Sequence, residues 1–132
     1  MKCFEHAHFL QSATAGLHLA LKVFKEKYGW EDGDEIITSP LTFVSTNHAI
    51  MYENLKPVFA DVNEDTFCLD VSSVKSLITE NTKAILYISV YGNVGNIEEL
   101  CKFAKDNNII SVGISLESQL FSIVNFLKKE KN

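Results

Sequence analysis

The stretch of residues 34–62 restricts the fold more than any other, because it has the pattern of a strand, a helix and a second strand. The β-branched run Glu35–Ser39 is closed by Pro40, which lacks an amide donor and restricts the residue before it. The spacing of apolar residues predicts a helix over Val44–Tyr52, and Val58–Val62 is a second apolar run. Two strands joined by a helical crossover form a βαβ unit, which implies a parallel sheet buried on both faces.

Helical spacing also predicts a first helix between Ser12, a natural N-cap, and Gly29, a natural stop. The apolar stripe of this helix consists of Leu17, Ala20, Leu21, Phe24 and Tyr28. One face of the crossover helix is expected to carry four residues, Val44, His48, Met51 and Tyr52.

Two further helices and two further strands complete the alternation. The helices are expected at Val71–Ile78, after Asp70 as N-cap, and at Ile97–Asp106, where Asn96 and Glu99 have the spacing of a capping box. The strands are expected at Lys83–Ser89 and Ile109–Ile114. Because helices and strands alternate with no repeat, linker or low-complexity run, the sequence predicts a three-layer α/β fold with a mainly parallel sheet flanked by helices.

The loop Ser39–Phe43 is the expected ligand site of this fold. It follows a predicted strand, and it carries two hydroxyls and an aromatic ring. Ligands of parallel sheets bind beyond the carboxyl ends of the strands.

Composition excludes several classes of function. With 132 residues and a net charge of −5, the chain has no electrostatic support for binding nucleic acid. The scattered Cys3, Cys68 and Cys101 suggest neither a zinc site nor a disulfide framework. His6 and His8 lack a third ligand nearby and are interpreted as surface or lightly packed side chains. No apolar run has the length of a membrane span or the pattern of a signal peptide, so we expect a cytoplasmic protein.

Three motifs, in order and at matching spacing, carry a resemblance to a known family. They are Gly33–Ile37 (GDEII), Pro40–Thr46 (PLTFVST) and Lys56–Val62 (KPVFADV), and Lys83–Ser89 followed by Tyr91–Asn93 (YGN) extends the match. The sequence resembles the DegT/DnrJ/EryC1/StrS family of pyridoxal-phosphate-dependent sugar aminotransferases. The resemblance implies that the chain is part of the large domain of a fold-type-I transferase dependent on pyridoxal 5'-phosphate.

The resemblance also implies site residues and partners. Ala13 and Thr14 would hold the cofactor phosphate at the start of the first helix, where free amides and the helix dipole favour an anion. Phe43 would stack on the pyridine ring of the cofactor, whereas on its own it would be interpreted as a core phenylalanine. The substrates would be a nucleotide-linked keto-sugar, used in cell-surface polysaccharide or sugar biosynthesis, and glutamate as amino donor. The family is dimeric, so a homo-oligomer is expected.

The resemblance ends after Ile110. The next family motif supplies an aspartate for the pyridinium nitrogen, but Ile114 stands at or within one residue of that position. Glu117 falls roughly where the family has Gln or His, and Ser89 stands where it usually has His. The later lysine that forms the Schiff base has no counterpart up to Asn132. Catalytic residues are therefore not assigned.

The divergent segment 111–132 is predicted to form a strand and an amphipathic helix. One face of that helix would carry Leu116, Leu120, Ile123, Val124 and Leu127. We therefore interpret residues 1–132 as one partial domain, of which residues 12–110 are aminotransferase-like. The abrupt loss of similarity is what a frameshift or a gene truncation would produce.

These observations lead to two main hypotheses for function. In the first, the chain is a truncated sugar aminotransferase that is inactive alone, because the Schiff-base lysine and the pyridinium aspartate are absent. In the second, it is a non-catalytic α/β module for binding or dimerisation. A receiver-like or flavodoxin-like domain is a third possibility, but the acidic pair of a receiver does not precede Asp61, and Lys83 begins a strand.

Overall fold

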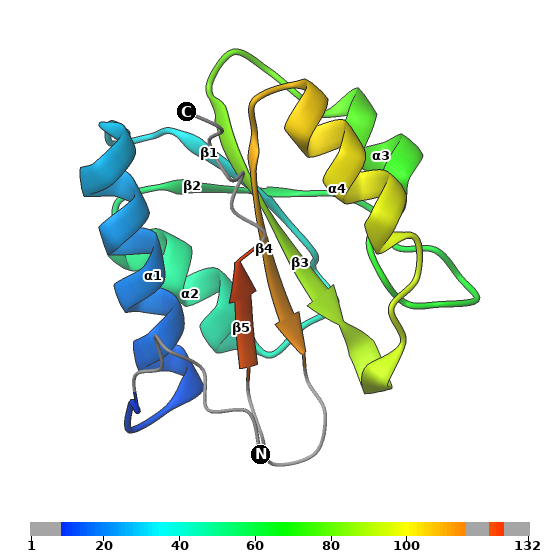
Figure 1. The fold of residues 1–132 in the computed structure, drawn as a ribbon, viewed down its shortest axis with the longest axis horizontal. Helices are drawn as coiled ribbons and strands as arrows, with labels where there is room; N and C mark the ends of the chain where they lie inside the picture. The colour runs from blue at the N-terminus through cyan, green and yellow to red at the C-terminus, as the bar shows by residue number, and fades with distance from the viewer. Residues whose placement is uncertain (1–8, 116–121, 126–132) are drawn as a thin grey trace, which may run out of the picture.

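The computed structural model describes residues 9–115 and 122–125, and its centre is a five-stranded sheet of order β2-β1-β3-β4-β5 (Figure 1). The strands are β1 (Glu35–Thr38), β2 (Lys56–Phe59), β3 (Thr82–Ser89), β4 (Ile110–Ser115) and β5 (Ser122–Asn125). The first four are parallel, and β5 pairs antiparallel with β4. The predicted α/β fold with a mainly parallel sheet is confirmed.

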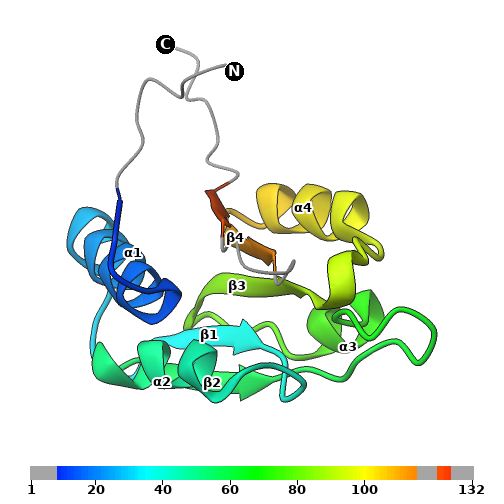
Figure 2. The same cartoon turned by 90° about the horizontal axis from the view of Figure 1, so that it is seen from below.

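Helices cover both faces of the sheet and complete the three layers (Figures 1 and 2). One face carries α1 (Ala13–Tyr28) and α2 (Val44–Tyr52), and the other carries α3 (Val71–Ser76) and α4 (Ile97–Asp106). Alternate strand residues divide between two cores, because successive side chains of a strand point to opposite faces. Ile36 and Leu86 belong to the core beneath α1 and α2, and Ile37 and Ile85 belong to the core beneath α3 and α4.

The ends of α1 form as the sequence predicts. The side chain of Ser12 accepts a hydrogen bond from the backbone N–H of Ala15 at 3.2 Å, and Gly29 adopts the left-handed conformation with φ +65°. Most of the predicted apolar stripe faces the core. Tyr28, its last member, is 42% exposed and stacks on Trp30 at 6.3 Å between ring centroids.

The capping box predicted for α4 is wrong, and the face predicted for α2 is not its buried one. Val44, His48, Met51 and Tyr52 share one side of α2, as predicted, but that side is exposed, and the buried residues are Thr46, Ala49 and Ile50. Apolar residues occur on several sides of this short helix, so the connections to β1 and β2 decide which side is buried. At α4, the side chain of Asn96 makes no cap hydrogen bond, since its backbone (φ −94°, ψ 41°) is not in the extended region that an N-cap requires.

The predicted C-terminal helix is also wrong where the structure describes it. Residues 122–125 form β5, which pairs with β4 from Val112↔Asn125 to Ser115↔Ser122. The pair of β-branched residues in SIVN suits a strand, and pairing satisfies backbone groups along the open edge of β4. The rest of the predicted helix, and His6 and His8, lie outside the described residues.

A buried carboxylate at the amino end of β1 makes stability depend on pH. Glu35 accepts hydrogen bonds from the Thr79 hydroxyl at 2.6 Å and from Lys56 Nζ at 2.9 Å, and these bonds lower its pKa. In the unfolded chain, the pKa of a glutamate is about 4.3. Because the pKa of Glu35 is lower in the folded state, its ionised form stabilises the fold above that pH, and this stability is lost as the pH falls through the pKa of the folded state.

We therefore expect Thr79→Val to move the acid unfolding midpoint to higher pH, because it removes the donor with the largest effect on the pKa of Glu35. Circular dichroism during acid titration measures the midpoint. Glu64→Gln, at an exposed carboxyl, is the control and should leave the midpoint in place. A Thr79→Val titration that superimposes on that of the unsubstituted chain contradicts this account.

Candidate functional site

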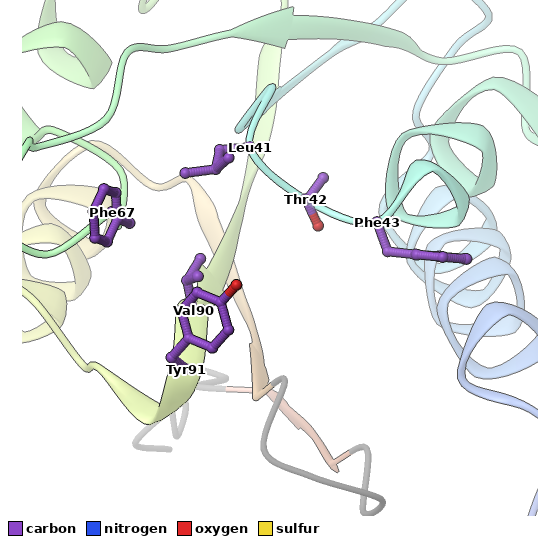
Figure 3. A pocket seen from close by; sticks show the side chains of 6 residues that line it. All are labelled: Leu41, Thr42, Phe43, Phe67, Val90 and Tyr91. Atoms are coloured by element: carbon purple, nitrogen blue, oxygen red, sulfur yellow. The ribbon is translucent and has the colours of Figure 1, made fainter.

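A pocket of about 500 Å³ lies at the carboxyl ends of β1 and β3 (Figure 3). The six residues that line it come from three loops and are Leu41, Thr42, Phe43, Phe67, Val90 and Tyr91. Its volume is within the usual range for sites of small molecules. This position agrees with the prediction of a ligand site in the loop that follows the first strand. None of the six lining residues is of a charged type.

The β1–α2 loop is fixed by its own hydrogen bonds. Ser39 Oγ accepts from the backbone N–H of Leu41 at 3.0 Å. Asn47 accepts from the Thr38 hydroxyl at 3.0 Å and donates to the Ser39 carbonyl at 3.3 Å. With the backbone held in this way, Phe43 is 69% exposed, so it is not the core residue that its chemistry alone would suggest.

The loop after β3 is tied down by buried side chains beneath it. The Ser89 hydroxyl and the Cys68 thiol both donate to the Asn93 carbonyl, at 2.6 Å and 3.2 Å. The Tyr87 hydroxyl donates to the Val94 carbonyl at 2.7 Å. Ser89 stands where the family named in the sequence analysis usually has histidine. Here its hydrogen bond helps to hold this loop in its conformation.

The N-terminus of α1 lies at the same edge of the sheet. Because a short connection joins the other end of α1 to the amino end of β1, the helix begins where the arrowheads of β3 and β4 lie (Figure 1). Within the described residues, the N–H groups of Ala13 and Thr14 and the Thr14 hydroxyl have no hydrogen-bond partner. These three donors fit an anion such as a phosphate.

The structure brings the predicted site residues together only in part. Phe43 lines the pocket, and Figure 3 shows its ring directed toward α1 and α2, away from Phe67 and Tyr91. Ala13 and Thr14 lie at the same edge of the sheet but do not line the pocket. Sequence reasoning missed Phe67 as a lining residue, and it identified Tyr91 only as part of a motif, without a role.

Other kinds of site receive no support from the part of the chain that the structure describes. There, no group of three or more His, Cys, Asp or Glu side chains could hold a metal ion. None of the helices in residues 9–115 and 122–125 is both long and apolar enough to cross a membrane.

Comparison with known proteins identifies relatives. A sequence model of the DegT/DnrJ/EryC1/StrS aminotransferase family matches residues 3–112. GDP-perosamine synthase of Escherichia coli O157:H7 is 32% identical over 108 residues, which are 82% of this chain and 29% of that protein. UDP-4-amino-4-deoxy-L-arabinose--oxoglutarate aminotransferase of Shewanella sediminis (strain HAW-EB3) is 46% identical over 88 residues, 67% of this chain and 22% of that protein. The chain thus spans about a quarter of the length of these relatives.

The fold has close counterparts among solved structures. A GDP-4-keto-6-deoxymannose-3-dehydratase with a trapped PLP-glutamate geminal diamine matches with a TM-score of 0.72 and 28% identity. The match covers 79% of this chain and 28% of that one. The α/β arrangement therefore corresponds to one part of a larger pyridoxal-phosphate protein.

Proposed function

The chain belongs to the DegT/DnrJ/EryC1/StrS aminotransferase family, and from this premise we propose that it forms the part of a sugar aminotransferase that holds the phosphate and one ring face of pyridoxal 5'-phosphate. The observation that carries the proposal is the beginning of α1. Three donors of Ala13 and Thr14, which have no partner among the residues that the structure describes, lie there, at the edge of the sheet that also holds the pocket with Phe43.

In this proposal the residues of the chain bind and orient the cofactor. The two amides and the Thr14 hydroxyl donate to the phosphate, which the positive end of the helix dipole also stabilises. Phe43 contacts the ring, and its direction toward α1 supports this role, because the phosphate of the same cofactor would lie at the start of α1. When bound, the cofactor supplies an electron sink for a carbanion formed on the substrate.

The proposal assigns no catalytic step to these 132 residues. Ile114 has no proton or charge to offer a ring nitrogen, and the sequence contains no counterpart of the lysine that holds the cofactor covalently. Nucleotide-linked keto-sugars and glutamate, the reactants expected from the resemblance, are therefore proposed as reactants of a whole enzyme, of which this segment covers about a quarter.

We expect the purified chain alone to show no transaminase turnover. A coupled assay for 2-oxoglutarate, with a nucleotide-linked keto-sugar and glutamate, measures it. Formation of product above a protein-free blank, in proportion to the concentration of the chain, would contradict the proposal.

Cofactor binding is tested with pyridoxamine 5'-phosphate, because it has no aldehyde that could react with surface lysines. We expect it to bind more tightly than pyridoxamine, which lacks the phosphate. Thr14→Ala should weaken binding of the phosphorylated form about tenfold, since hydrogen bonds to charged groups contribute about 1.5–3 kcal/mol. Ser76→Ala, an exposed hydroxyl on α3, is the control. Equal affinities for the two ligands would refute the phosphate site and leave the chain as a non-catalytic module.

A further inference from the structure

The sheet has two outer strands, β2 on one side and β5 on the other (Figure 1). Among the residues that the structure describes, β2 pairs with β1 alone and β5 pairs with β4 alone. An outer strand presents a row of backbone N–H and C=O groups, which are a template for pairing with a strand of another chain. The residues of each outer strand decide whether such pairing is opposed or favoured.

The residues of β2 oppose pairing with another chain. The strand begins with Lys56, whose side chain is 62% exposed, and continues with Pro57, which has no amide donor. Lysine and proline on an outer strand are two of the means by which proteins prevent association through sheet edges. The β2 side of the sheet is therefore protected.

The residues of β5 carry no such protection. The strand Ser122–Asn125 contains no charged residue, proline or glycine, and its two central residues are β-branched, which favours strands. In the sequence, the run without charge, proline or glycine extends over residues 118–127, between Glu117 and Lys128. Uncharged segments of high β propensity without proline are the segments that pair with copies of themselves.

The composition of β5 suits a second copy of the same strand. Two identical strands related by a two-fold axis run antiparallel, and the residue at the axis lies opposite its own copy. A charged residue at that position would meet a like charge, which destabilises the pair. At the centre of β5, either Ile123 or Val124 would instead lie opposite another β-branched residue, and such pairs stabilise a sheet.

We infer that β5 pairs antiparallel with β5 of a second copy of this chain, so that one sheet continues across two molecules. The contact lies outside residues 3–112, which the family model matches, and it does not rest on the proposed function. Four residues on each side fall well short of the roughly 20–30 of a standard interface, so the association is weak and depends on concentration. Because the pairing uses the open side of β5 in both molecules and β2 is protected, assembly stops at a dimer.

Sedimentation equilibrium of the full chain, at concentrations up to about 1 mM, where weak complexes form, measures the association. We expect a reversible equilibrium between monomer and dimer. A chain that remains monomeric over the whole range overturns the inference. Growth into species larger than a dimer also overturns it, because a two-fold pair leaves no open side of β5 for a third molecule.

Pairs of charged variants test the contact itself. If Ile123 lies at the axis, Ile123→Lys and Ile123→Glu should each weaken the dimer at least about tenfold, because like charges then meet. An equal mixture of the two variants should restore the dimer, since lysine then lies opposite glutamate. Val124→Lys and Val124→Glu give the same test for an axis at Val124. Restoration in one of the two mixtures locates the axis, and a variant that merely fails to fold cannot produce it. Restoration in neither mixture refutes pairing through β5.

Phe59→Lys is the matched control on the opposite side of the sheet. Phe59 ends β2 and is 52% exposed, so the substitution introduces the same charge where no contact is inferred. We expect Phe59→Lys to dimerise as the unsubstituted chain does. A dimer that is lost in Phe59→Lys, or that persists unchanged with charges at Ile123 and at Val124, forms through another surface and overturns the inference.

Discussion

Gly95→Ala is expected to lower the free energy of unfolding by about 3 kcal/mol, the sum of backbone strain and overlap in a packed interior. Gly95 has φ +46°, where a side chain is strained. A Cβ atom there would lie 2.7 Å from Tyr87 Oη and 2.9 Å from Cys68 Cβ. Neither neighbour moves freely, because the Tyr87 hydroxyl bonds to the Val94 carbonyl and Cys68 is buried.

The chain offers matched controls for this substitution. Gly29 and Gly33 also have positive φ, at +65° and +88°, but a Cβ atom at either position would meet no other part of the described chain within 4 Å. Gly29→Ala and Gly33→Ala should therefore show only the strain, about 1 kcal/mol each. Urea unfolding with linear extrapolation measures all three variants. If Gly95→Ala costs no more than the controls, the loop over Tyr87 and Cys68 is not packed as described.

The same substitution should disturb the pocket. Burial raises the pKa of Tyr87, so its hydroxyl remains a protonated donor at neutral pH. Displacing that hydroxyl breaks its hydrogen bond to the Val94 carbonyl, so the loop that contains Tyr91 loses one of its anchors. The glycine thus connects the stability of the domain to the geometry of the pocket that Tyr91 lines.

The sequence predicts the fold well where one physical signal dominates. Alternating apolar runs and helical stripes place four parallel strands and four helices, because burial on both faces of a sheet leaves long apolar runs. The caps at Ser12, Gly29 and Asp70 form as expected, since capping depends on local chemistry. The loop after β1 lies at the pocket because the carboxyl ends of parallel strands share one edge of the sheet.

The remaining features depend on tertiary contacts that no local pattern carries. The buried side of α2 follows from its connections, and the strand at Ser122–Asn125 follows from the open edge of β4. Phe67 and Tyr91 have positive φ angles, and the presence of an aromatic residue in a sequence does not predict this conformation. The sequence therefore predicts the part of the pocket formed by Leu41, Thr42 and Phe43, whereas it misses Phe67 and Val90 and contains Tyr91 only as part of a motif.

The stripe of α1 leads to the second large effect, because it contrasts two leucines on the same helix. Leu21 is 1% exposed and packs in the core with Ile50 and Leu86, whereas Leu19 is 47% exposed. Leu21→Ala should lower the free energy of unfolding by about 3 kcal/mol, from lost burial and the cavity left behind. Leu19→Ala should change it by less than about 1 kcal/mol, since alanine is also the better helix former.

Urea unfolding of both variants under the same conditions measures the difference. The comparison removes the effects of helix propensity and of the chemical change, which are identical at the two positions. A loss at Leu19 equal to that at Leu21 would mean that the outer face of α1 is covered in solution. Because Leu19 is exposed among the described residues, such a result would contradict the orientation that the structure gives α1.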